Sequence, residues 1–261
     1  MDQNSHFENA KRRLTRYNPQ TFNALMAEAG VCERRFDKRR YRVCGQESKL
    51  TFRTCKLLDG DKVVYLKSVR EDIDEQSKEK YRLKLLTEAI ALAKLDGLEG
   101  VPKLYAIENA GDEFYLVIGE VYGQPILSST VLCPNRVVRR MVNGATLLDE
   151  IHKRGVFHRD IEGPNIISSA DKVSFIDFDC ARVEGYVDIE EANGRFEGAE
   201  KNRAPERTIG NTTRTSEVYS LGSFFYKMIS NIPKSDLRSE IEKILSKATA
   251  IKPEERYRTA E

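Results

Sequence analysis

The spacing of apolar residues in the first part of the chain is typical of helices. Phe22 and Met26 fall on one helical face, and the pair Asn18–Pro19 supplies a cap and a first helical position. Gly30 stands where that helix would end. We therefore expect residues 1–40 to be helical, with a polar and basic first half.

From Tyr41 the pattern changes to short runs typical of β-strands. The runs YRVCG, LTFRTCKLL and KVVYLKSV are separated by polar or glycine-containing turns, which predicts an antiparallel meander. Apolar residues then recur at helical spacing from about Ile73 to Leu95. Two further strands, KLYAIEN and EFYLVI, follow this predicted helix.

Helical patterns dominate the second half of the chain. After the segment Gly119–Gly123, helices are predicted at Arg136–Lys153, Ser216–Ile229 and Ser235–Ala248, and the short strands NIISS and KVSFID lie between the first two. A β-rich part with one long helix, followed by a mostly helical part, indicates an α+β protein with two lobes. We expect a ligand site between those lobes, because such clefts commonly bind ligands.

The composition is that of a globular protein. The chain has 261 residues, of which 40% are hydrophobic and 32% charged, enough for two modest lobes with a solvated surface. The five cysteines are scattered without a CxxC pair, so neither a zinc site nor a disulfide framework is predicted. No apolar stretch reaches the length of a membrane span. We expect a cytoplasmic protein without a transmembrane segment.

Positive charge is concentrated near the N-terminus. The formal net charge is only +2, but Lys11–Arg16 and Arg34–Arg42 are rich in lysine and arginine. Such runs could bind nucleic acid, an anionic lipid surface or the protein's own cleft. The alternative is a solvated helix face without a partner.

The segment FHRDIEGPNIISSADKVSFIDFDCA, at residues 157–181, is the most informative in the chain. Its HRD triplet and the following Asn165 match the HRDxxxxN catalytic loop of protein kinases, and its DFD triplet stands where that family has DFG. An APE triplet, the helix start EVYSLG and a closing PxxR element follow in the family's order. The chain from roughly Tyr41 to its C-terminus therefore resembles the protein kinase-like superfamily, as a divergent and minimal eukaryotic-type Ser/Thr kinase. The motif residues are His158–Asp160, Asn165, Asp177–Asp179, Ala204–Glu206, Glu217–Gly222, Pro253 and Arg256.

The resemblance implies a bilobal protein-kinase-like fold, with a small antiparallel β lobe carrying one long helix and a mainly helical large lobe. It assigns a helical basic N-terminal extension to residues 1–40, the small lobe to 41–119 and the large lobe to 120–261. ATP and Mg²⁺ are the implied cofactors, and a protein hydroxyl is the implied acceptor of the γ-phosphate.

Phosphoryl transfer needs positioning and charge neutralisation more than covalent chemistry by the protein. By the family pattern, Asp160 would orient the acceptor hydroxyl and take its proton, with Arg159 beside it in the catalytic loop. Asn165 and Asp177 would supply the hard oxygen ligands that suit Mg²⁺ held together with substrate phosphates. Taken singly, such Asp and Asn residues could equally be local loop caps.

The predicted nucleotide-binding residues lie mainly in the β-rich part. Lys67 ends the strand KVVYLKS and resembles the lysine that grips the α- and β-phosphates, with Glu88 on the following helix as its expected ion-pair partner. Gly45 is the one glycine kept from the family's glycine-rich loop. The resemblance also assigns Ile118, Glu120 and Asp177 to nucleotide binding.

Three positions and one loop depart from the family pattern. Tyr65 replaces the small residue that packs on adenine, so the nucleotide pocket would be reshaped or partly filled. Glu162 stands where Ser/Thr kinases have a lysine, and it would turn outward or pair with a cation. Asp179 replaces the DFG glycine, and the loop after Gly45 lacks the remaining glycines of GxGxxG.

The activation segment Cys180–Arg203 contains neither serine nor threonine, and Tyr186 is its one hydroxyl-bearing residue. We expect a constitutively ordered segment, with Arg159 paired to the acidic run Asp188–Glu191 in place of a phosphorylated residue. Cys180 is expected to be inert core. A buried pair between Glu206 and Arg256 is also expected.

Three functions remain open at this level. The first is an ATP-dependent Ser/Thr protein kinase, favoured by the motif set. The second is a kinase of a sugar, lipid or other small molecule, favoured by Tyr65, Asp179 and the short link SNIPK after the predicted helix that ends at Ile229. The third is a pseudokinase that binds partners, favoured by the degenerate glycine loop.

Overall fold

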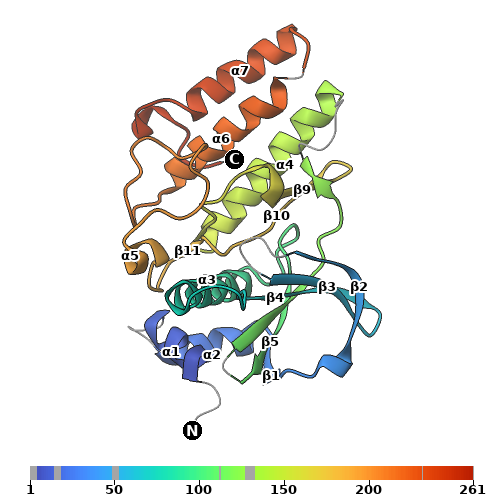
Figure 1. Cartoon of the computed structure of the whole chain (residues 1–261). Coiled ribbons are helices and arrows are strands. Elements are labelled where there is room, and N and C mark those ends of the chain that lie inside the picture. The colour runs from blue at the N-terminus through green and yellow to red at the C-terminus, as the bar shows by residue number, and fades with distance from the viewer. Residues whose placement is uncertain are drawn as a thin grey trace. The chain divides into compact units, whose positions relative to one another are not determined.

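A computed structural model gives the fold of the protein (Figure 1). It describes residues 5–14, 19–48, 53–111, 113–126, 133–230 and 232–260. The chain forms two compact units. Unit 1 comprises Met1–Glu120 and Val183–Asn193, and unit 2 comprises Val121–Arg182 and Gly194–Glu261.

A six-stranded sheet forms the centre of unit 1. Its strands are β1 (Cys32–Arg35), β2 (Tyr41–Ser48), β3 (Arg53–Asp59), β4 (Lys62–Ser68), β5 (Leu104–Ala110) and β6 (Glu113–Gly119). They lie in the order β1-β5-β6-β4-β3-β2, in which β1 runs parallel to β5 and the other neighbours are antiparallel. The meander predicted from Tyr41 onward is confirmed.

One face of this sheet is apolar because hydrophobic residues two positions apart in β4 and single ones in β3, β5 and β6 point to the same side. The buried cluster consists of Leu57, Val64, Leu66, Ala106 and Val117. Fully burying one such Val or Leu side chain stabilises the fold by about 1.5–3 kcal/mol. The intervening residues of β4 therefore point to the opposite face.

Helices surround α3 in unit 1. The helical elements are α1 (Ser5–Leu14), α2 (Pro19–Glu28), the short 3-10 helix η1 (Lys38–Arg40), α3 (Glu75–Lys94) and α5 (Ile189–Asn193). Asp74 caps α3 by accepting a hydrogen bond from the Ser77 backbone N–H at 2.9 Å. Figure 1 shows α1 and α2 beside α3, and both helices pack against it.

The expectation of helix throughout residues 1–40 is wrong for Cys32–Arg35, which forms strand β1. Its sequence CERR has no apolar alternation, and its pairing with β5, more than seventy residues later, decides its conformation. Gly30 ends the helical part with a φ of +66°, whereas the Asn18 cap lies outside the described residues. The proposed boundary at residue 40 does not coincide with a division between units, and Val183–Asn193 falls in unit 1.

Unit 2 is mainly helical, as predicted. Its helices are α4 (Pro134–Lys153), α6 (Arg214–Ile229), α7 (Asp236–Ala248) and the 3-10 turns η3 (Gly163–Asn165) and η4 (Pro253–Glu255). Its short strands are β7 (Gln124–Pro125), β8 (Val156–Phe157), β9 (Ile166–Ser169), β10 (Lys172–Phe175) and β11 (Arg182–Val183), whose last residue lies in unit 1. Strands β9 and β10 form the predicted hairpin.

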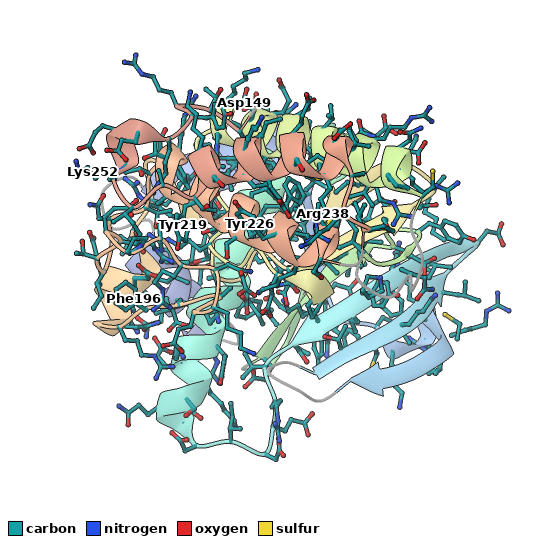
Figure 2. All side chains as sticks on the ribbon, turned by 90° about the horizontal axis from the view of Figure 1, so that it is seen from above. Asp149, Phe196, Tyr219, Tyr226, Arg238 and Lys252 are labelled. Carbon is teal, nitrogen blue, oxygen red and sulfur yellow. The ribbon has the colours of Figure 1, made fainter. Side chains whose placement is uncertain are left out.

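Close packing of α6 and α7 fixes the helical layer of unit 2. A Cβ added at Gly222 would lie 3.0 Å from the Ala248 side chain, so a larger residue there would push the two helices a few tenths of an ångström apart. Tyr226 (Figure 2) donates a hydrogen bond from α6 to the Glu242 carbonyl on α7 at 3.1 Å. In the part of the chain that the structure describes, no helix combines the length and apolar character needed to cross a bilayer.

The expected pair between Glu206 and Arg256 is present. The guanidinium donates to the two carboxylate oxygens at 2.7 and 2.8 Å, and it also donates to the carbonyl of Ala250 at 2.7 Å. Arg256 is 4% exposed, so its charge depends on these partners. The pair joins the APE segment to the end of the chain.

Candidate active site

The first group of predicted site residues lies in unit 1, where β4 faces α3. The Lys67 ammonium lies 2.7 Å from the Glu88 carboxylate, so the contact expected from the sequence is present. Lys67 is 7% and Glu88 3% exposed. A charge at this depth needs a partner, and the pair fixes the direction of the lysine side chain.

Tyr65 shares the face of β4 that carries Lys67, because the two residues are two positions apart. Ile118 on β6 and Lys56 on β3 lie directly opposite Tyr65 in the sheet and therefore on the same face. Lys56 also donates a hydrogen bond to the Glu120 carboxylate. A ligand that reaches Lys67 along this face would meet the phenol ring of Tyr65.

Gly45 lies in strand β2, where the register between β2 and β3 shifts between Val43 and Glu47. Such an irregularity bends the strand locally. The predicted phosphate loop continues to residue 50, and residues 49–52 lie outside the described part of the chain. Binding of phosphate by this loop stays a prediction.

The second group of predicted site residues lies in unit 2, around the turn η3. Asn165 donates from its side-chain amide to the Asp160 carboxylate at 2.6 Å and to the Asp160 carbonyl at 3.1 Å. Burial raises the pKa of Asp160 to about 6, and the negative charges of Glu162, Asp179 and Asp177 act in the same direction. Asp160 is thus an oriented carboxylate with the basicity of a proton acceptor near neutral pH.

His158 connects the catalytic loop to the strand that leads into the DFD motif. Its Nε2 lies 3.0 Å from the Ile176 carbonyl, and its Nδ1 accepts from the Asp160 backbone N–H at 3.3 Å. Since a carbonyl can only accept, Nε2 is the donor in this contact, and Nδ1 is the acceptor for the Asp160 N–H. The backbone of Ile176 also donates to the Asn165 carbonyl at 2.9 Å. These bonds hold Asp160 and Asp177 in one local framework.

Asp177 and Arg159 both have backbone φ angles of +66°. This left-handed conformation costs a residue with a Cβ roughly 1–3 kcal/mol and often marks functional positions. Gly198 approaches the same loop, and Ala199 donates a backbone hydrogen bond to the Arg159 carbonyl at 3.3 Å. These backbone contacts hold Arg159 in its strained conformation.

The donors near Asp160 fit a Mg²⁺–nucleotide complex better than a free metal site. No cluster of three His, Cys, Asp or Glu side chains suited to a metal occurs among the described residues. Mg²⁺ commonly binds one or two protein carboxylates and takes its remaining ligands from phosphates and water. Asn165 and Asp177 could supply oxygen ligands of this kind, and a cation would offset the negative charge that raises the pKa of Asp160.

A buried carboxylate on α6 holds the catalytic loop, and the sequence analysis did not assign it this role. Glu217 accepts from the backbone N–H groups of Arg159 at 2.5 Å and His158 at 3.0 Å. Its carboxylate also lies 2.8 Å from Nε2 of His152 on α4. No spacing in the sequence indicates this contact, because residue 152 precedes residue 217 by sixty-five positions.

Arg159 has a second partner in unit 2. Its Nε donates to the Thr212 hydroxyl at 2.7 Å, and the Nε of Arg207 donates to the same oxygen at 3.1 Å. Arg182 donates to the Thr212 carbonyl at 2.7 Å. The pairing of Arg159 with the acidic run Asp188–Glu191 stays a prediction. Cys180 is buried, as expected of a core residue.

The basic N-terminal runs form ion pairs within unit 1. Arg13 lies 2.7 Å from Glu79, and Arg40 lies 2.8 Å from Asp59. Arg34 binds the buried carboxylate of Glu108 at 2.5 Å. These positive charges are paired with carboxylates of unit 1, which weakens the sequence-based case for a nucleic acid or an anionic surface as a partner.

An apolar pocket of about 400 Å³ lies among the helices α4, α6 and α7 of unit 2. Val142, Leu221, Phe225 and Ile244 contribute to its lining. None of the residues predicted for the nucleotide or the metal is among its described lining residues. The pocket is therefore distinct from the predicted catalytic residues.

Comparisons with known proteins agree with this geometry. A family model for the protein kinase domain matches residues 43–259. The chain is 26% identical over 185 residues to serine/threonine-protein kinase D of Synechocystis. The match covers 62% of this chain and 37% of that protein. It is also 25% identical over 179 residues to probable serine/threonine-protein kinase PknB of Lactococcus lactis. That match covers 65% of this chain and 27% of the relative.

A third relative, serine/threonine-protein kinase PknB of Mycolicibacterium smegmatis, is 26% identical over 157 residues, which covers 49% of this chain and 25% of that protein. Because the family model spans most of the chain, the protein belongs to the protein kinase domain family. The chain spans less than two-fifths of the length of these relatives.

Proposed function

We propose that the protein transfers the γ-phosphate of ATP to a serine or threonine hydroxyl of a protein. The observation that carries the proposal is the oriented, basic carboxylate of Asp160, held by Asn165 and by the backbone contacts of Glu217. The motif order and the similarity to Ser/Thr kinases support the same reaction.

In the proposed reaction, each of the two groups of residues has its own role. Lys67, directed by Glu88, binds the phosphates. Asp160 orients the acceptor hydroxyl and accepts its proton, since its raised pKa lets it hold a proton more readily than an ordinary aspartate. Asn165 and Asp177 would hold Mg²⁺, which neutralises charge on the phosphates when it is bound.

A small-molecule acceptor is the second candidate, and the position of Tyr65 favours it. The phenol on the Lys67 face changes the surface that a nucleotide base would meet. The Tyr65 ring does not itself form a surface for binding a protein substrate. The two candidates share the phosphate donor and differ in the acceptor.

Incubation with γ-labelled ATP and Mg²⁺ tests the proposal. We expect label on the chain itself or on a generic protein, located at serine or threonine by mass spectrometry, and no label with the Asp177→Ala variant. Label only on a metabolite would support the small-molecule candidate. Nucleotide binding without any transfer would indicate a pseudokinase and would refute the proposal.

A further inference from the structure

Helix α1 packs against α3 through side chains that repeat at helical spacing. Phe7, Ala10 and Leu14 are each at most 2% exposed. The ring of Phe7 lies 5.2 Å from the ring of Phe114 on β6, in an edge-to-face arrangement. Helix α1 is therefore fixed to the sheet as well as to α3.

Polar contacts set the direction of α1 on the same surface. Arg13 near its C-terminus forms a 2.7 Å ion pair with Glu79 on α3. Lys11 lies over the rings of Phe7 and Phe22 at 5.3 and 5.0 Å from their centroids. Helix α2, which carries Phe22, is joined to α1 by this contact.

The segment that follows the DFD motif is attached to both helices. The backbone N–H of Val187 donates to the carbonyl of Leu14, the last residue of α1, at 3.1 Å. Lys94, the last residue of α3, donates to the Glu184 carbonyl at 3.1 Å. Helix α3 also packs on α5. Helix α1, helix α3 and the segment Val183–Asn193 thus meet within unit 1.

Helix α3 is buried on all sides along the stretch that carries Glu88. Twelve consecutive residues, Arg82–Ala93, are buried. A surface helix usually buries one stripe and leaves the opposite face in water. Because the helix has contacts all around, rotation that moves Glu88 away from Lys67 would disrupt the packing of the buried side chains.

We infer that α1 is a built-in positioning element for phosphate transfer: it holds α3 so that Glu88 pairs with Lys67, and it binds Val183–Asn193 without a phosphorylated residue. The inference rests on the proposed function. It also explains how Val183–Asn193, which contains neither serine nor threonine, can be held in place. Phe7 and Lys94 are the positioning residues.

Substitution of Phe7 in the full chain tests this role. We expect Phe7→Ala to speed amide exchange in Val183–Asn193 about tenfold. We also expect kcat/KM for ATP to fall about tenfold. The Phe7→Leu variant keeps an apolar side chain and should restore both quantities. The control is Ile241→Ala, a buried position on α7 in unit 2, which should lower the melting temperature while both quantities stay at the wild-type values.

Lys94→Met gives a second test without a change in the apolar core. It removes the hydrogen bond to Glu184 and keeps a side chain of similar length. We expect exchange in Val183–Asn193 to rise about threefold. The matched control is Lys103→Met, which removes an exposed pair with Asp96 at 3.1 Å and should leave this exchange unchanged.

The inference is overturned if Phe7→Ala releases α1, shown by fast exchange of its own amides, while Val183–Asn193 and kcat/KM remain as in the wild type. It is also overturned if Ile241→Ala has the same effects as Phe7→Ala. If the wild type transfers no phosphate, the proposed function fails, but the exchange data still decide whether α1 holds the segment.

Discussion

The buried carboxylate of Glu217 allows a quantitative prediction. Its oxygens accept hydrogen bonds from Arg159 and His158 of the catalytic loop and lie 2.8 Å from Nε2 of His152. Burial by itself raises the pKa of Glu217, but the hydrogen bonds from His152 and the loop outweigh it and lower the pKa. The group is therefore ionised at neutral pH. The informative substitution is Glu217→Gln, which keeps the shape and removes the charge.

Glutamine has one oxygen where glutamate has two, so its NH₂ group must face at least one of the three N–H donors. A buried donor without an acceptor costs about 1–3 kcal/mol. The remaining bonds also weaken, because bonds to a charged acceptor are roughly twice as strong as neutral ones. We expect Glu217→Gln to lower the free energy of unfolding by about 2–4 kcal/mol.

A change of tautomer at His152 would not rescue the variant. If Nε2 became the acceptor for the new NH₂ group, the proton would move to Nδ1. Among the described residues, Nδ1 of His152 has no hydrogen-bond partner and is buried. The unsatisfied donor would be moved from one nitrogen to the other, and its cost would remain.

Urea unfolding at pH 7 measures this loss, with Glu242→Gln as the control. Glu242 pairs with Arg238 one turn away at 2.8 Å, and its side chain is 43% exposed. The control should therefore change the free energy of unfolding by about 0.5 kcal/mol or less. Because Glu217 holds the backbone before Asp160, we also expect its variant to reduce kcat. A loss below about 1 kcal/mol, equal to that of the control, would refute the reasoning.

Two further predictions concern backbone strain and acid stability. Gly198→Ala should lower the free energy of unfolding by about 3 kcal/mol, because at a φ of +86° its Cβ would lie 2.5 Å from the Arg159 carbonyl oxygen. The control Gly185→Ala has a φ of +88° but lies in open space, so it should cost about 1 kcal/mol. Equal losses of the two variants in thermal unfolding would contradict this prediction. Burial raises the pKa of Glu206, but hydrogen bonds from Arg256 outweigh it and hold the pKa below its usual value. The stability from this pair is complete above the pKa of an unfolded glutamate and is lost as the pH falls through the lowered pKa. Arg256→Met should therefore be about 3 kcal/mol less stable than the wild type at pH 7 and closer to it at low pH. A difference in stability that does not change with pH would count against this prediction.

The regular elements could be predicted from the sequence because their patterns are local. Alternation in KVVYLKS predicts β4, and helical spacing between Ile73 and Leu95 predicts α3. The pairs Lys67 with Glu88 and Glu206 with Arg256 follow from motif order, since each motif carries a fixed structural context. These parts of the site needed no knowledge of tertiary packing.

The parts of the structure that could not be predicted from the sequence depend on contacts between distant segments. Strand β1 is polar and owes its conformation to β5. The basic run at Lys11–Arg16 indicated a separate extension, whereas the buried face of α1 is formed by residues interspersed among the charges. The partner of Glu217, His152, lies on another helix. Patterns read along one segment do not identify such partners.

Transfer of γ-labelled phosphate by the wild type and by Asp160→Asn tests the central claim most directly. Asparagine keeps the shape of the side chain and removes a carboxylate whose pKa burial raises, so the variant should be at least as stable as the wild type at pH 7. We expect the wild type to label a protein and the folded variant to transfer no phosphate above background. Equal transfer by both proteins, or none by the wild type with ATP bound, would contradict the account.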